Sequence, residues 1–130
     1  MKKEEVPPGF EQEVMNIAVD FDGVIHDFSK GWHDGTCYGE PLPEAIESIK
    51  LLSKKFNVIV FTAKAKPNRP LVNGKTGKQL VSEWLDKHGV LSCVSEITSE
   101  KPRAQLYIDD KGYRFCNWKD TLRYIKENHE

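Results

Sequence analysis

The chain has 130 residues, of which 38% are hydrophobic and 30% are charged, and its formal net charge is −1 at pH 7. This composition fits one globular domain and gives no overall bias towards nucleic acid or membrane surfaces. No apolar run approaches the roughly 20 residues that span a bilayer, and the cysteines (Cys37, Cys93 and Cys116) show no C-x-x-C spacing. We therefore expect a reduced, cytoplasmic protein.

The first expected element is a buried strand. An apolar run over 14–19 contains several β-branched residues, which predicts a strand. Two carboxylates, Asp20 and Asp22, follow this run, and Gly23 then lets the backbone turn sharply. Because a strand buried on both faces cannot hold unpaired carboxylates, they belong at its carboxyl end, where open α/β sheets bind ligands. Neighbouring carboxylates repel each other, so we expect a cation to neutralise them.

The later segments alternate between helices and strands. Spaced glycines and aromatic residues over 23–40 predict a turn and a small hairpin, a segment that we call the flap. The other elements follow from hydrophobic periodicity and helix-end signals. They are a helix over 41–55, a strand over 57–61, a basic loop over 63–78, a helix over 77–88, a strand within 90–98, strands over 104–108 and 113–116, and a helix over 118–128.

This alternation predicts an α/β fold with a mostly parallel, five-stranded sheet covered by helices on both faces. In the prediction, residues 1–12 form a flexible lead-in and residues 13–130 form one domain, a Rossmann-like three-layer sandwich. We expect the strand order 5-4-1-2-3, in which the first and fourth strands are neighbours. This order brings Asp20 close to the pair Asp109-Asp110.

Three further polar signals lie at the ends of strands or just before one. Thr62 closes the second strand, Lys101 precedes the fourth, and Asp109-Asp110 closes the fourth. The carboxyl ends of parallel strands share one edge, so this edge gathers carboxylates, a hydroxyl and an ammonium group. This set suits phosphoryl chemistry, because Mg²⁺ takes oxygen ligands while lysine and hydroxyl groups orient phosphate oxygens.

Taken together, these signals resemble the four motifs of the haloacid dehalogenase superfamily, over nearly the whole chain. The motifs are, in chain order, Asp20-Phe21-Asp22-Gly23, Phe61-Thr62-Ala63, Lys101 and Asp109-Asp110. The resemblance implies a phosphatase in which Asp20 is the nucleophile that forms an aspartyl-phosphate. It also implies that Asp22 protonates the leaving oxygen and then activates the hydrolytic water.

The resemblance also implies which groups bind the phosphoryl group and the cofactor, Mg²⁺. The phosphoryl ligands are expected to be Thr62, Ala63 and Lys101. The metal ligands are expected to be Asp20, the backbone carbonyl of Asp22, and the pair Asp109-Asp110. We favour Asp110 as the direct ligand of this pair, which leaves Asp109 to orient Lys101 or a metal-bound water.

The two intervals where family members carry a cap domain are short in this chain. The resemblance therefore implies a capless member, either a monomer or a homo-oligomer in which a neighbouring subunit helps to cover the site. Trp32 of the flap and Arg69 of the basic loop are expected substrate-binding residues, because an aromatic face beside a cation suits an anionic ligand. The expected substrate is a phosphorylated small molecule or a nucleic-acid end. Packing of the flap is an equal alternative for Trp32 and Tyr38.

Two other kinds of function remain open. A receiver-like signalling domain also uses a phosphorylated Asp, an acidic pair, a Thr and a Lys, but in receivers the acidic pair comes first. A catalytically silent phosphate- or metal-binding module on the same fold is the second alternative. A zinc site in or near the flap is disfavoured, because its candidate ligands match no common zinc spacing. These candidates are His26, Asp27, His33, Asp34 and Cys37.

Overall fold

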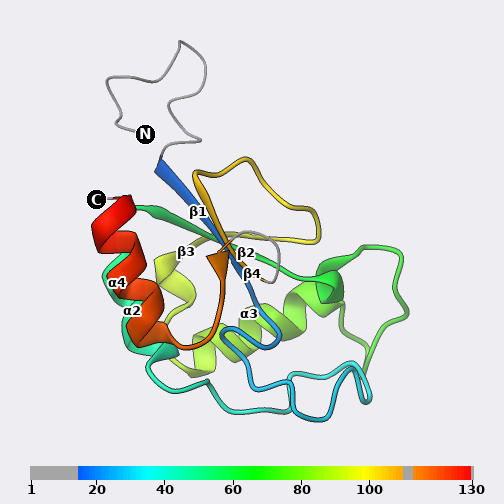
Figure 1. The fold of residues 1–130 in the computed structure, drawn as a ribbon. Coiled ribbons are helices and arrows are strands. Elements are labelled where there is room, and N and C mark those ends of the chain that lie inside the picture. Colours follow the sequence, from blue (N-terminus) through cyan, green and yellow to red (C-terminus); the bar gives the residue numbers. More distant parts are fainter. Residues whose placement is uncertain (1–14, 110–112, 130) are drawn as a thin grey trace.

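A computed structural model of the chain describes residues 15–109 and 113–129. The expected lead-in over 1–12 and the expected metal ligand Asp110 lie outside the described residues. Helices and strands alternate along the described chain (Figure 1). Their bounds are β1 Asn16–Asp20, α2 Ala45–Leu52, β2 Asn57–Phe61, the 3-10 turn η2 Ala63–Ala65, α3 Gly77–Lys87, the 3-10 turn η3 Leu91–Cys93, β3 Val94–Thr98, β4 Leu106–Asp109, β5 Tyr113–Arg114 and α4 Trp118–Asn128.

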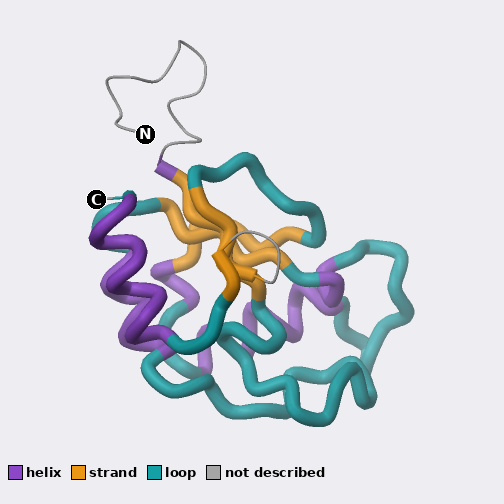
Figure 2. The backbone as a smooth tube through the Cα atoms, viewed as in Figure 1, coloured by secondary structure: helices purple, strands orange, loops and turns teal. Residues whose placement is uncertain are grey.

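The strands form one parallel sheet, in the order β3-β2-β1-β4-β5. The predicted α/β class with a parallel sheet is confirmed. β1 lies between β2 and β4, and Asp20 pairs in register with Phe61 at the end of β2. In Figure 2 the flap and the basic loop lie at the end of the sheet where β1 finishes. The pairing therefore brings the expected site residues to one edge, beside these two loops.

The interior of β1 is apolar and fully enclosed. The side chains of Ile17, Ala18 and Val19 are 0% exposed, and successive side chains of a strand point to opposite faces. Both faces of the sheet are therefore covered at β1. In Figure 1, α2 and α4 lie beside each other, and α3 lies apart from this pair. Trp84 of α3 and Trp118 of α4 are both buried in the core.

The start of one helix differs from the prediction, whereas the start of another agrees with it. The helix expected over 41–55 is shorter, because Glu44 has a positive φ of 66° that no residue inside a helix can adopt. Helix α3 begins as expected at Gly77, where Thr76 and Gln79 form a reciprocal capping box. The left-handed residue before α2 gave no clear sequence signal, whereas the capping residues before α3 did.

The small hairpin expected in the flap is reduced to one antiparallel bridge, between His26 and Pro41. Turns and bends occupy most of the segment between them, and the side chains of Asp27 and Asp34 fix two of them. Asp27 accepts a hydrogen bond from the backbone N–H of Ser29 at 2.9 Å, and Asp34 accepts one from Thr36 at 3.0 Å. Such local bonds offer the backbone an alternative to strand pairing. The flap is therefore an irregular loop held by its own side chains.

Candidate phosphoryl-transfer site

The expected site residues lie at the carboxyl edge of three neighbouring strands. Asp20 ends β1 and pairs in register with Phe61, the residue before Thr62. Asp109 ends β4, which pairs with β1 on its other side. Neighbouring strands lie about 4.8 Å apart. The fold thus brings Asp20, Thr62 and Asp109 together from distant parts of the sequence.

Asp22 lies at the centre of a cluster of hydrogen-bond donors. Its Oδ1 is 3.0 Å from Nδ1 of His26, and its Oδ2 is 2.9 Å from Nζ of Lys64. The hydroxyl of Thr62 also donates to Oδ2, at 3.5 Å. The Asp22 side chain keeps 14% of its surface exposed. Donors therefore occupy both oxygens of the expected acid–base residue, while solvent still reaches it.

His26 is fully buried beside Asp22 and uses both ring nitrogens. The backbone N–H of Gly39 donates to Nε2 at 2.8 Å, so Nε2 is an acceptor and the ring proton lies on Nδ1. Nδ1–H consequently donates to Asp22. The ring also stacks on Phe21, with centroids 5.0 Å apart and planes at 7°. Because both nitrogens are engaged, His26 is not a metal ligand in this arrangement, and the zinc alternative finds no support.

Lys64 is a part of the site that the sequence did not reveal. The sequence placed it in the basic loop over 63–78, where lysine side chains are usually exposed, but its side chain is only 1% exposed. The η2 turn folds inwards, and the Lys64 ammonium lies 4.6 Å from the ring centroids of both Phe28 and Trp32. A buried ammonium needs compensation, which the Asp22 carboxylate and the two rings supply.

Lys101 forms a second ion pair on the same edge. Its Nζ lies 2.6 Å from Oδ2 of Asp109, whose side chain is 3% exposed. The ammonium also lies 5.2 Å from the ring centroid of Tyr107 and 5.7 Å from that of Phe61. This contact agrees with the alternative in which Asp109 orients Lys101, rather than with Asp109 as the direct metal ligand.

The chemistry of the donors fits a hard cation such as Mg²⁺. Asp20 offers carboxylate oxygens at the strand end, and the backbone carbonyl of Asp22 accepts no hydrogen bond from a described residue. Oxygen donors of this kind are the ones that Mg²⁺ takes. Within the described ranges, no group of three His, Cys, Asp or Glu side chains is arranged to hold a metal. Among the described residues, the fit therefore depends on Asp20 and the Asp22 carbonyl.

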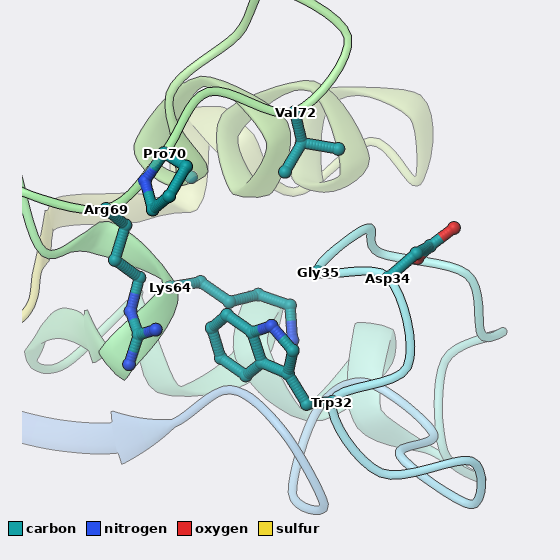
Figure 3. Close-up of a pocket in the computed structure, with 8 residues that line it drawn as sticks. Trp32, Asp34, Gly35, Lys64, Arg69, Pro70 and Val72 are labelled. Atoms are coloured by element: carbon teal, nitrogen blue, oxygen red, sulfur yellow. The ribbon is translucent and has the colours of Figure 1, made fainter.

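A cleft of about 220 Å³ opens between the flap and the basic loop (Figure 3). Lining residues include Trp32, Asp34, Gly35, Lys64, Arg69, Pro70, Val72 and Gly77. The guanidinium of Arg69 lies 4.4 Å from the Trp32 ring centroid, and its Nε donates to the carbonyl of Ala63 at 3.0 Å. The two expected substrate-binding residues thus lie together, next to the second motif.

The charge of this cleft is mainly positive. Arg69 makes no ion pair with a carboxylate in the part of the chain that the structure describes. On the acidic side is Asp34, and the side-chain hydrogen bond from Thr36 lowers its pKa. A second cleft, of about 540 Å³, borders Gly23, and its charged lining residues are two acidic ones, Glu44 and Asp120, and one basic one, Lys119. An anionic substrate is therefore better matched to the cleft at Arg69.

Tyr38 packs within the flap, as the alternative to substrate binding predicted. Its hydroxyl donates to the carbonyl of Gly31 at 2.8 Å and accepts from the backbone N–H of Lys30 at 2.9 Å. Its ring packs against His26, with centroids 5.2 Å apart. Tyr38 therefore closes the flap on itself, whereas Trp32 is 39% exposed at the cleft.

Comparison with known proteins leaves the site as the main guide to function. No family model, no curated protein and no solved structure matches this chain. None of the described helices is long and apolar enough to cross a membrane. The function is therefore inferred from the residues at the shared carboxyl edge of the sheet and from their contacts.

Proposed function

We propose that this chain is a Mg²⁺-dependent phosphomonoester hydrolase of the haloacid dehalogenase type, with an aspartyl-phosphate intermediate on Asp20. The observation that carries the proposal is the position of Asp20, Thr62 and Asp109 at the ends of neighbouring parallel strands. The ion pair between Lys101 and Asp109 adds an ammonium group to this edge. The capless sandwich with strand order 5-4-1-2-3 belongs to the same proposal.

In the first step an Asp20 oxygen attacks phosphorus and the bond to the leaving oxygen breaks. The electron pair of that bond stays on the leaving oxygen, which takes a proton from Asp22. Thr62 and Lys101 orient the phosphoryl oxygens. When bound, Mg²⁺ supplies positive charge that offsets the repulsion between the phosphoryl group and the carboxylates.

In the second step water hydrolyses the aspartyl-phosphate. The water oxygen bonds to phosphorus as the bond between phosphorus and Asp20 breaks, and its electron pair returns to the Asp20 carboxylate. Asp22 takes the proton that the water loses. Inorganic phosphate then leaves, and the site returns to its starting state.

The proposed substrate is a phosphorylated small molecule or a nucleic-acid end. The cleft between the flap and the basic loop supports an anionic substrate, because Lys64 and Arg69 both line it. Trp32 lies against both cations and holds them in place. The proposed working form is a cytoplasmic monomer or a homo-oligomer in which a second subunit covers the open edge.

The test is a screen of phosphorylated metabolites and 3′-phosphate oligonucleotides with and without Mg²⁺. We expect phosphate release that EDTA abolishes and added Mg²⁺ restores. Asp20→Asn should be inactive and folded, because an amide is a poor nucleophile. Asp86→Asn, an exposed change on α3, is the matched control and should retain activity. Full activity of Asp20→Asn would refute the mechanism.

A labelling experiment on the same protein distinguishes the two remaining functional alternatives. After acid quenching, ³²P from a labelled substrate should be found on Asp20 only transiently during turnover. A label that persists for hours without phosphate release would favour the receiver-like domain. Phosphate binding with neither label nor turnover would favour the silent binding module.

A further inference from the structure

We propose that Lys64 and His26 are positioning residues that hold Asp22 as the proton acceptor for hydrolysis of the aspartyl-phosphate. The inference rests on the proposed function. It assigns roles to two buried side chains that the four motifs do not contain. It also assigns the donor cluster around Asp22 to the second chemical step, not the first.

The hydrogen bonds at Asp22 fix the orientation of its carboxylate. His26 Nδ1–H faces Oδ1 at 3.0 Å, and the Lys64 ammonium faces Oδ2 at 2.9 Å. One donor on each oxygen fixes both the position and the rotation of the carboxylate group. A carboxylate has about four lone-pair sites, so these donors and Thr62 leave room for a bond from water. The 14% exposed surface of Asp22 is where that water can approach.

The two donors, His26 and Lys64, are themselves held in place by other contacts. His26 is 0% exposed, stacks on Phe21 and accepts from Gly39 through its other nitrogen. Lys64 is 1% exposed and lies against the rings of Phe28 and Trp32. A long lysine side chain normally loses considerable rotamer entropy when it is fixed. Here the packing has already fixed it, so the Asp22 carboxylate needs no rearrangement before it takes a proton.

Of the two chemical steps, the second depends more on the position of Asp22. A leaving group that is already a weak base needs little protonation, so the first step then depends little on where Asp22 lies. Hydrolysis of the aspartyl-phosphate always needs a carboxylate placed to receive a proton from water. In that step the water oxygen bonds to phosphorus, the Asp20–phosphorus bond breaks, and the electron pair returns to Asp20. Lys64 and His26 hold the Asp22 carboxylate in one place and one rotation, and this step depends on both.

The inference predicts a distinctive kinetic pattern for Lys64→Met. Methionine fills the space without the charge, so the second step should slow, on the order of 10²-fold if Asp22 loses its place. With p-nitrophenyl phosphate the leaving group needs little protonation, so the first step should stay near its normal rate. In a two-step reaction, slowing only the second step lowers kcat and KM together and leaves kcat/KM unchanged. A burst of p-nitrophenolate, up to one equivalent of enzyme, should precede the slow steady rate.

Matched variants separate positioning from a general effect on the fold. Lys87→Met removes a positive charge from an exposed position on α3 and should leave kcat unchanged. Lys64→Ala leaves space for a small cation, so added ethylammonium should raise its steady-state rate but not that of Lys64→Met. If Lys64→Met fails to fold, His26→Leu should show the same burst, and His26→Asn, which keeps an N–H donor, should lose less activity.

The outcomes distinguish this inference from the proposed function. The wild type and Asp20→Asn are measured first, and absence of phosphate release from the wild type would remove both proposals. With an active wild type, an equal fall of kcat and kcat/KM in Lys64→Met, with no burst, would overturn the role of Lys64 alone. Retention of full kcat in Lys64→Met would overturn it equally. A burst with unchanged kcat/KM supports it.

Discussion

Gly77 lies so close to Lys64 that a Cβ atom on residue 77 would overlap the carbonyl oxygen of Lys64. The first residue of helix α3 therefore packs directly against the backbone of the η2 turn. Because the contact is with backbone atoms, a flexible side chain cannot move aside to relieve it. The placement of Lys64 next to Asp22 thus depends on the absence of a side chain at residue 77.

Gly77→Ala should consequently destabilise the protein, although alanine is intrinsically the better helix residue by about 1 kcal/mol. Overpacking of this kind typically costs about 1–3 kcal/mol. We expect a lower urea midpoint and a fall in kcat, because the η2 turn has to shift. Lys78→Ala, an exposed change at the next position, should stay within about 0.5 kcal/mol of the wild type. Equal stabilities of the two variants would contradict the close approach.

Asp22→Asn should reduce both activity and stability. Loss of acid–base help lowers kcat by about 10²–10⁴-fold. The substitution also leaves the buried Lys64 ammonium without its carboxylate, a change that costs on the order of 3 kcal/mol. Urea unfolding and steady-state kinetics measure the two effects.

The double variant Asp22→Asn with Lys64→Met is the control for this pair. Removing both charges should restore much of the stability lost in Asp22→Asn, since no unpaired charge remains buried. Activity should not return. Strictly additive losses of stability in the two single variants would show that the 2.9 Å contact carries no interaction energy.

Arg69→Ala should weaken substrate binding more than chemistry. If the guanidinium binds a second anionic group of the substrate, its loss removes a charged hydrogen bond and raises KM about ten-fold or more. The measurement compares a nucleoside bisphosphate with phenyl phosphate, which lacks a second anionic group. Only the bisphosphate should show the rise. Lys66→Ala removes one positive charge from an exposed position in the same loop. An equal rise of KM in that variant would indicate that the loop attracts the substrate through its overall charge and not through a specific contact with Arg69.

Cys37 should be the slowest cysteine to react in the native protein. Burial raises the pKa of its thiol to about 12, and the thiolate is the reactive form. Alkylation at pH 8 followed by mass spectrometry should modify the exposed Cys116 first, and modification of Cys37 should speed up as pH rises. In denaturant the difference should vanish. Rapid native modification of Cys37 would show that the flap opens away from the core.

The strand ends were predictable because they depend on local signals. The apolar runs before Asp20, Thr62 and Asp109 identify buried strands, and polar residues directly after them belong at the shared edge. That the fold is α/β with a parallel sheet follows from the same alternation. The assignment of Asp109 to Lys101 or to a metal needed the 2.6 Å contact, which no sequence spacing reveals.

The burial of Lys64 and His26 was not predictable in the same way. Lys64 follows Thr62 in a stretch rich in lysine, which is typical of a solvated loop. Its burial depends on Phe28 and Trp32 of the flap, more than thirty positions earlier in the chain. His26 had one weak signal, since it comes four residues after Asp22. Without the path of the flap, that spacing does not indicate a contact.

Gly39 joins the flap to the core through both of its backbone groups. Its N–H donates to Nε2 of His26, and its carbonyl accepts from Nε1 of Trp84 at 2.9 Å. Lifting the flap breaks both bonds and frees the His26 proton to move between the two ring nitrogens, which releases Oδ1 of Asp22. Flap closure and carboxylate orientation are therefore thermodynamically linked, and the linkage is reciprocal. A ligand that holds the flap down stabilises the ordered carboxylate, and a ligand that engages the carboxylate draws the flap closed by the same free energy.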